Sequence, residues 1–166
     1  ENAVGFIKNY KGGKYGFAAL LPDEAIPLEE YAASLSGARL LSVFSNAESA
    51  SVDAWLPKFS CEYSAALNDA LAQMGMSSAF SSETADFTRL GSSSLGNLYI
   101  GKVIHKTFFS VSELGTRAGA ASAVSIEAES APMYDYTVKL DRPFVYAIID
   151  NAANLPIFLG TMQIPS

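Results

Sequence analysis

Two residues in this sequence could act as a nucleophile or a metal ligand but occur only once, His105 and Cys61. A Ser-His-Asp triad, or a metal site with histidine ligands, would have to be built around His105. The other residues on the same face of its predicted strand are apolar or Thr, which favours a buried histidine with a structural role. Cys61 lies in an alternating strand pattern with no nearby feature that would activate its thiol, so we expect it to pack as a small apolar side chain.

The remaining candidates for catalysis are paired carboxylates, and each pair falls in a predicted loop or on a helix surface where a solvated face explains it. Gly12-Gly13 lacks the strand-to-helix context and the Lys-Ser/Thr ending of a phosphate-binding loop, and it is typical of a turn. We therefore expect no metal, no cofactor and no enzymatic activity, with a metal-free hydrolase as the enzyme alternative. The carboxylate pairs are Asp23 with Glu24, Glu29 with Glu30, and Glu127 with Glu129.

The segment Glu113–Pro132 is unusual in composition, because twelve of its twenty residues are Ala, Gly, Ser or Thr and none is aromatic. Structureless loops of this length are uncommon and usually functional. Its small residues alternate, with Thr116, Ala118 and Ala120 on one parity and Arg117 on the other. This alternation would let the segment enter a β-sheet with a small face inward. The alternative is a disordered Ala/Ser linker.

Composition and charge exclude several classes of protein. The 166 residues are 49% hydrophobic and 17% charged, as in an ordinary globular domain. The longest apolar run, Phe144–Ile149, suits a buried strand and is far shorter than the roughly 20 residues of a membrane-spanning helix. The net charge of −6, with basic residues scattered singly, gives no footprint for a phosphate backbone or an anionic membrane. We expect neither nucleic acid nor a membrane as a partner.

The elements that must position the segment Glu113–Pro132 follow from periodicity and breakers. Ser64 is a predicted N-cap for a helix that ends at Gly75, and residues 77–97 should form a surface loop. Alternation predicts one long strand over Leu98–Ser112, directly before the small-residue segment. The pattern as a whole predicts an α+β fold with about eight strands and three short helices. Further strands are expected over residues 4–10, 15–21, 51–56, 59–61, 134–140, 144–149 and 157–162, a hairpin turn at 11–14, and further helices over 28–35 and 38–44.

The run Glu113-Leu114-Gly115-Thr116, followed by the Ala-rich stretch to Val124, resembles the hinge of the serpin family. Other stretches are similar to serpin signatures in order and spacing across essentially the whole chain. They are Leu20-Leu21-Pro22-Asp23, Leu56-Pro57-Lys58-Phe59, Val103-Ile104-His105-Lys106, Asp141-Arg142-Pro143-Phe144-Val145 and Phe158-Leu159-Gly160. The resemblance is to the C-terminal half of the family. It implies mixed, mostly antiparallel sheets with a few short helices, as a partial serpin fold over residues 1–166.

The resemblance implies an inhibitor that acts as bait: a serine protease attacks the exposed reactive-centre loop, at about residues 113–132, and the cleaved loop inserts into a large sheet. The family count puts the cleaved bond at Glu129–Ser130, and Ala128 beside it is small. The implied target is a glutamyl-specific, elastase-like or subtilisin-like enzyme. The implied hinge comprises Glu113, Gly115, Thr116, Ala118, Ala120 and Ala121.

The same resemblance implies structural roles for His105, as a buried control point, and for Lys58, as an ion-pair partner of Glu113. Serpins are over twice this length, so we expect this chain to be a piece that needs the N-terminal serpin half to inhibit. The chain begins at Glu1 without a signal segment, and secretion is expected only from the resemblance. A non-inhibitory serpin-fold carrier or chaperone is the alternative function.

Overall fold

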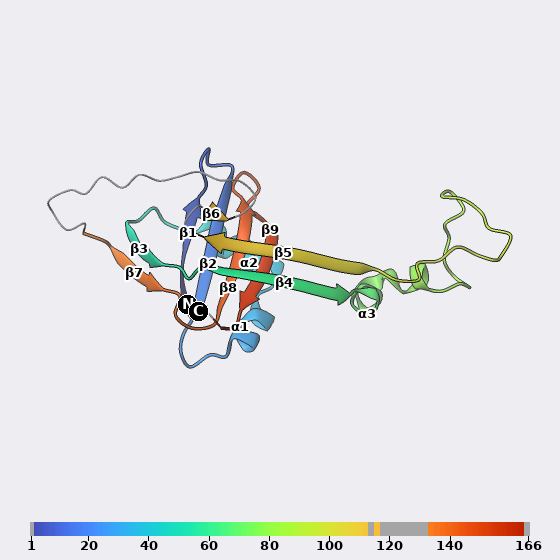
Figure 1. Cartoon of the computed structure of the whole chain (residues 1–166), viewed down its shortest axis with the longest axis horizontal. Coiled ribbons are helices and arrows are strands. Elements are labelled where there is room, and N and C mark those ends of the chain that lie inside the picture. Colours follow the sequence, from blue (N-terminus) through green and yellow to red (C-terminus); the bar gives the residue numbers. More distant parts are fainter. Residues whose placement is uncertain (1, 113–114, 117–132, 165–166) are drawn as a thin grey trace. The chain divides into compact units, whose positions relative to one another are not determined.

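The computed structural model describes residues 2–112, 115–116 and 133–164. These residues divide into two compact units, one formed by residues 1–59 with 111–166 and the other by residues 60–110. The first unit is built on a four-stranded antiparallel sheet in the order β1-β2-β8-β9 (Figure 1). Its strands are β1 (Ala3–Asn9), β2 (Tyr15–Pro22), β8 (Phe144–Asp150) and β9 (Leu155–Met162).

Two turns of this sheet have the backbone that their residues favour. Gly12 and Gly13, in the predicted turn between β1 and β2, take φ angles of 90° and 69°. Asn154, before β9, takes a φ of 51°, which Asn tolerates better than most residues.

Gly160 of β9 lies so close to Tyr146 that an added Cβ would fall 2.5 Å from the tyrosine oxygen. The close packing of β8 on β9 therefore needs glycine at this position.

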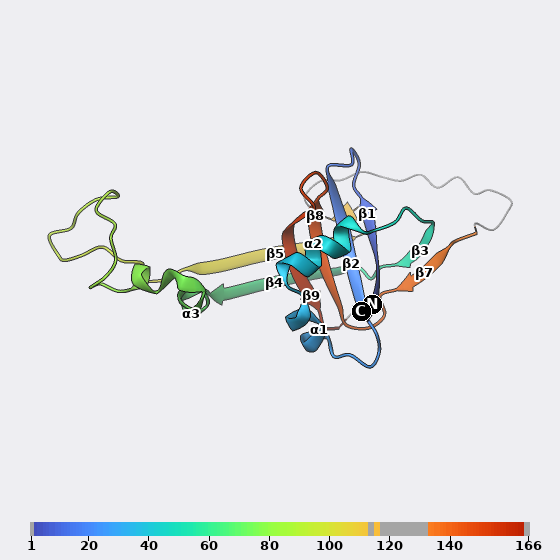
Figure 2. The same ribbon diagram turned by 180° about the vertical axis from the view of Figure 1, so that it is seen from behind.

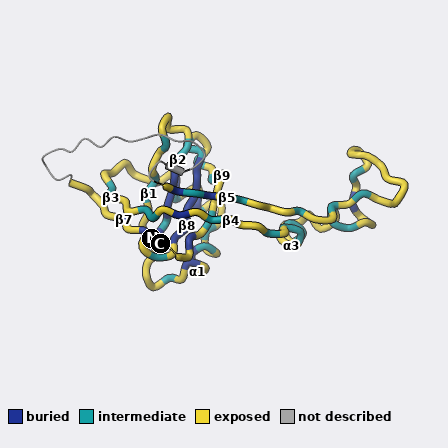
Figure 3. Tube along the Cα trace, viewed as in Figure 1, coloured by how far each residue is buried: buried dark blue, intermediate teal, exposed yellow. Residues whose placement is uncertain are grey.

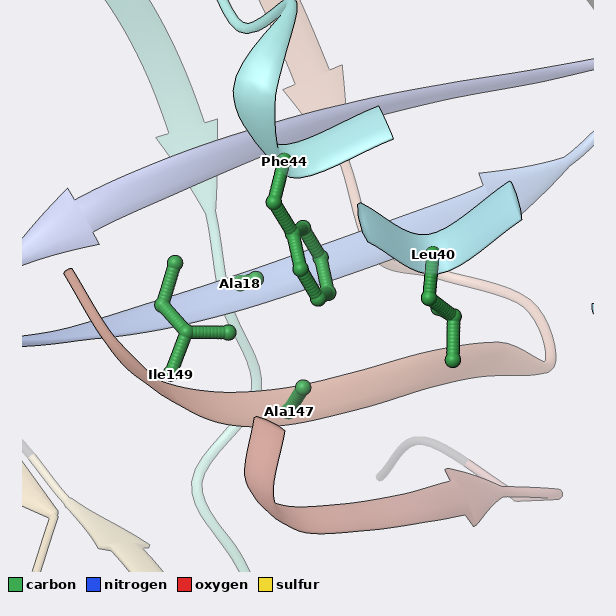
Figure 4. Close-up of a cluster of buried hydrophobic side chains, with 5 residues drawn as sticks. All are labelled: Ala18, Leu40, Phe44, Ala147 and Ile149. Carbon is green, nitrogen blue, oxygen red and sulfur yellow. The ribbon is translucent and has the colours of Figure 1, made fainter. Parts of the chain in front are cut away.

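The core of the first unit forms on both faces of β8, which is buried from Phe144 to Ile149. Helices α1 (Leu28–Ser34) and α2 (Gly37–Ser45) cover one face (Figure 2). Phe44 and Leu40 point from α2 toward β2 and β8 (Figure 4). On the other face the ring of Phe59 lies 6.0 Å from Phe144 and 5.3 Å from Tyr146, centroid to centroid. The apolar run therefore forms the buried strand that the sequence predicts.

The first strand after the predicted loop region pairs with a strand from much earlier in the chain. β3 (Val52–Trp55) pairs in parallel with β7 (Tyr136–Lys139), with Val52 opposite Tyr136 and Trp55 opposite Lys139. Pro57 interrupts the strand pattern after β3, as expected, and β4 (Phe59–Ala66) follows. Apart from the β3–β7 pair, the strand registers that the described residues define are antiparallel.

The second unit is a ribbon of two strands that ends in short helical turns and a loop. β4 and β5 (Ile104–Ser112) run side by side in opposite directions (Figure 1). Between these two strands, the chain forms α3 (Asn68–Leu71), η1 (Ala72–Met76) and η2 (Ser77–Phe80). Most residues of this unit are exposed (Figure 3). The helical segments are thus short, and the described residues of this unit leave much of the apolar surface of the ribbon exposed.

Two predictions in this unit are wrong. Ser64 lies inside β4 and caps no helix, because the backbone of residues 64–66 continues the strand, and α3 begins only at Asn68. The stop at Gly75 is confirmed, since this glycine has a φ of 107°. The long strand predicted from Leu98 is shorter, because β5 begins at Ile104.

Hydrogen bonds explain the shortened strand. The side chain of Asn68 accepts from the Val103 backbone N–H at 2.9 Å and donates to the Gly101 carbonyl at 3.0 Å. The backbone N–H of Ile100 donates to the carbonyl of Ala79 at 2.9 Å. The backbone groups of residues 100–103 therefore pair with the helical turns, and the alternating pattern does not become a strand there.

Candidate functional site

The N-terminal end of the small-residue segment is a narrow antiparallel hairpin. β6 (Gly115–Thr116) pairs with the end of β5, with Ser112 opposite Gly115 and Val111 opposite Thr116. Thr116 and Gly115 are the two predicted hinge residues that the structure describes. The other predicted hinge and reactive-bond residues, Glu113, Ala118, Ala120, Ala121, Glu129 and Ser130, lie outside the described residues.

The end of β5 gives this hairpin a buried face. Phe109 and Val111 are both buried, Ser110 between them is half-buried, and the flanking Phe108 and Ser112 are exposed. Alternate residues of a strand point to the same face, so the buried side of β5 is the one that carries odd-numbered positions here. Residues opposite one another in an antiparallel pair share a face. In the backbone register, Thr116 pairs with Val111, one of the buried positions of β5.

The chain that follows the segment is attached to β3 through Asp135 and Ser51. Asp135 donates its backbone N–H to the Ser51 carbonyl at 2.8 Å, and its carboxylate accepts from the Ser51 backbone N–H at 2.8 Å. Beyond β7, the backbone N–H of Leu140 donates to the carbonyl of Trp55 at 2.9 Å. Hydrogen bonds at both ends thus hold β7 against β3 within the first unit.

The structure describes both residues with predicted structural roles, His105 and Lys58, and they belong to different units. His105 is exposed on β5, and its ring centroid lies 6.4 Å from that of Tyr63 on β4. The prediction of a buried histidine is therefore wrong for this chain, because no described side chain covers this end of the ribbon. Lys58 lies between β3 and β4, and its predicted partner, Glu113, lies outside the described residues. The control role of His105 and the Lys58–Glu113 ion pair stay predictions.

An exposed group beside β7 was not singled out from the sequence. Trp55 is 59% exposed, its indole N–H donates to the Asp53 carboxylate at 3.0 Å, and the Lys139 ammonium lies 5.0 Å from the centroid of its ring. The signal in the sequence is that Trp55 falls on the polar parity of its strand, together with Asp53. Lys139 could not be assigned to the group from spacing, because it comes from a strand distant in sequence.

The described part of the chain holds no group of three or more His, Cys, Asp or Glu side chains that could bind a metal ion. Nor do the described residues form a helix that is both long and apolar enough to cross a bilayer. The features that stand out among the described residues are the pairing of β6 with β5, the attachment of β7 to β3 and the group around Trp55.

Comparisons with known proteins agree on one family. A family model described as Serpin (serine protease inhibitor) matches residues 7–165. An uncharacterized serpin-like protein of Thermococcus kodakarensis is 37% identical over 159 residues, covering 94% of this chain and 36% of that protein. Leukocyte elastase inhibitor A of Mus musculus is 34% identical over 163 residues, covering 94% of this chain and 42% of that protein.

A solved structure gives the same result for the fold. The crystal structure of tengpin, a thermophilic serpin, in its native state matches with a TM-score of 0.87 and 50% sequence identity. The match covers 100% of this chain and 42% of that one. The chain therefore spans about two fifths of the length of these similar proteins, and its elements have the arrangement of the corresponding part of the solved structure.

Proposed function

This chain belongs to the serpin family of serine protease inhibitors, and we propose that it carries the reactive segment of an inhibitor that acts as a suicide substrate. In the proposed reaction, the serine oxygen of the protease attacks the Glu129 carbonyl carbon and forms an ester. The bond between Glu129 and Ser130 breaks, and the new amine of Ser130 leaves with a proton. Insertion of the cleaved segment into the sheet then distorts the protease before water hydrolyses the ester.

The pairing of β6 with β5 is the observation that carries this proposal. Thr116 lies opposite Val111, so continuing the same antiparallel register brings Ala118 opposite Phe109 and Ala120 opposite Thr107. Ala118 and Ala120 would then join the face of β5 on which Phe109 and Val111 are buried. The β5–β6 pairing is the start of a strand that could extend along β5. That extension requires the alternation of small residues.

Side-chain size and charge explain why the segment has this composition. Small neutral residues at the even positions can enter a packed sheet without a clash and without burying a charge. The charged Arg117 falls on the opposite parity, where an inserted strand would present it outward. A linker or a carrier has no need of this pattern, which favours an inhibitor over either alternative.

The proposed bait residue selects the target. A protease must accept Glu129 in its specificity pocket, with the small Ser130 after the cleaved bond. A trypsin-like pocket with a carboxylate at its base would repel Glu129 and leave it unpaired. We therefore propose a glutamyl-specific, elastase-like or subtilisin-like protease as the target.

We further propose that inhibition needs an N-terminal serpin half. The described residues supply β4 on one side of β5 and only β6 on the other. An inserted strand would pair with β5 along one edge. The hydrogen-bonding groups of its other edge would stay open unless a further strand lies beyond it. The 166-residue chain alone should be cleaved by the target without trapping it. Secretion of the complete protein is part of the same proposal, and its detection in culture medium after expression in the native host would test that part.

Adjacent alanines of opposite parity provide the test. In the complete protein, Ala120→Glu places a carboxylate on the buried face during insertion, at a cost of several kcal/mol if unpaired. Ala121→Glu is the matched control, because the same charge would face outward. We expect both variants to be cleaved, but only Ala121→Glu to keep the SDS-stable covalent complex with the protease. Equal yields of complex from the two variants would contradict insertion in this register.

The cleavage site is tested separately by sequencing the C-terminal peptide that the complex releases. It should begin at Ser130, and Glu129→Arg should shift inhibition toward trypsin-like proteases. A peptide that begins at Glu129 would instead make Ala128 the bait and favour an elastase-like target. If no serine protease in a panel that includes glutamyl-specific, elastase-like, subtilisin-like and trypsin-like enzymes forms a complex, the carrier or chaperone alternative replaces the inhibitor.

A further inference from the structure

Met133 is an apolar side chain that is 94% exposed and that follows the small-residue segment directly in the sequence. Exposure alone does not make a binding site, since single apolar residues are common on protein surfaces. Its place in the chain distinguishes Met133, because it lies only three positions after Ser130, the residue that follows the proposed cleaved bond. The side chain therefore belongs to the stretch that a protease meets together with that bond.

The short connection to Ser130 keeps Met133 inside the area that a protease covers. Three extended residues span at most about 11 Å, and any bend in the chain shortens this distance. A protease–inhibitor interface buries about 800 Å² on each partner, which corresponds to a patch that reaches roughly 16 Å from its centre. With the cleaved bond at the centre, Met133 lies within this distance in every conformation of the connection. The complete protein must leave this stretch open if the bond is to be cleaved.

The chain on the other side of Met133 is held by β3. Two positions later, Asp135 donates its backbone N–H to the Ser51 carbonyl, and its carboxylate accepts from the Ser51 backbone N–H, both at 2.8 Å. The Cα atom of Met133 therefore stays within about 7 Å of the Cα atom of Asp135. A side chain on a restrained backbone loses less freedom on binding, so more of its contact energy appears as affinity.

We propose that Met133 is a specificity-determining residue, which occupies an apolar subsite of the target protease on the side of its cleft that binds the residues after the cleaved bond; this rests on the proposed function above. Binding energy from parts of a substrate remote from the reacting bond can lower the barrier to cleavage. Met133 leaves the active site with the new amine of Ser130, so the contact exists only before the ester is formed. It raises the rate of capture and has no part in insertion.

The first test measures the second-order rate of covalent complex formation by the complete protein. Met133→Ala should lower this rate about 10-fold, as for the loss of roughly half of the apolar surface that a methionine can bury. Met133→Leu keeps an apolar side chain of similar volume and should restore the rate. Met74→Ala is the matched control, because Met74 is 81% exposed in η1 of the second unit, and its rate should stay unchanged. The final yield of complex should be the same in all variants.

Peptides separate a contact with the protease from a structural role within the inhibitor. A peptide of residues 125–135 contains both the proposed cleaved bond and Met133 without the folded protein. For a protease that cleaves after Glu129, Met133→Ala in the peptide should lower kcat/KM for this bond about 10-fold, and Met133→Leu should restore it. A methionine that only packs within the inhibitor would leave cleavage of the peptide unaffected.

The outcomes distinguish this inference from the proposed function. If complexes form after cleavage at Glu129 but Met133→Ala leaves the rate or the peptide unchanged, the role of Met133 is overturned and the inhibitor remains. A loss of thermal stability in the Met133→Ala protein, with an unaffected peptide, would show that the complete protein covers this side chain, and would also overturn it. An equal loss of rate in Met74→Ala would do the same. If no protease cleaves after Glu129, the proposed function fails and this inference fails with it.

Discussion

β8 and β5 differ both in residue pattern and in burial: β8 is an apolar run up to its last residue, whereas apolar and polar residues are mixed along β5. β8 is buried at every position from Phe144 to Ile149, whereas β5 is buried only at Phe109 and Val111 (Figure 3). β8 lies between β2 and β9, with α1 and α2 on one face and Phe59 on the other. Within the described residues the amino-terminal end of β5 has no such layer. An apolar strand becomes core only where other elements cover it.

The two units are also stabilised internally by different interactions. The first unit has a buried apolar core. The second unit relies more on side-chain hydrogen bonds to the backbone: Asn97 donates to the carbonyls of Ala85 and Ser82 at 2.7 and 3.1 Å, and Asn68 bridges Gly101 and Val103. Local bonds of this kind fix a conformation without burying much surface. We expect the second unit to open more easily than the first.

The largest contrast should appear when a phenylalanine is truncated in each strand. Phe144→Ala removes a ring from the buried core and should lower the free energy of unfolding by about 3–5 kcal/mol. Phe108→Ala, on β5, removes a ring that is 57% exposed and should change it by no more than about 0.5 kcal/mol. Urea unfolding of the 166-residue chain, followed by circular dichroism, measures both. Equal losses of stability would mean that β5 is covered as well as β8.

A smaller effect is expected from Asn68→Ala. The substitution leaves the Val103 N–H and the Gly101 carbonyl without their side-chain partner and should favour local opening of residues 100–103 by about 1 kcal/mol. Amide hydrogen exchange at Val103 should become faster while amides of β8 keep their protection. Asn46→Ala is the control, because the Asn46 side chain makes an exposed hydrogen bond to the hydroxyl of Ser42, whereas the backbone N–H that bonds the Ser42 carbonyl stays in the variant. Faster exchange in β8 and at Val103 alike would argue against two independent regions.

The smallest effect concerns Asp86 in the loop of the second unit. The Thr88 side-chain O–H and backbone N–H both donate to its carboxylate, at 2.7 and 3.2 Å, and they lower the pKa of Asp86. A lowered pKa means that the contribution of these bonds is present above the ordinary pKa of Asp and is lost as pH falls through the folded value. Thr88→Val should raise the pKa of Asp86 toward its ordinary value in an NMR titration. An unchanged pKa would show that the hydroxyl bond does not form in solution.

Several elements could be predicted because their signals are local. The Gly12-Gly13 turn, the break at Pro57 and the stop at Gly75 each depend on the conformational limits of the residue itself. The prediction at Ser64 was wrong because a good N-cap residue also fits a strand when a neighbouring strand pairs with it. The strand predicted over residues 98–103 was wrong because Asn68, far away in sequence, takes up its backbone groups.

The sequence by itself determined the family, the strand–helix order and the alternating small residues from Thr116, because these reside in residue type and spacing. Only the tertiary structure decided which apolar strand is buried, that His105 is exposed, and that Trp55 meets Lys139 beside a hollow. The physical reason is distance along the chain: the Ser51–Asp135 bonds that hold β3 to β7 join residues 84 positions apart. Local preferences cannot specify such a pairing, which depends on the layers that fold around it.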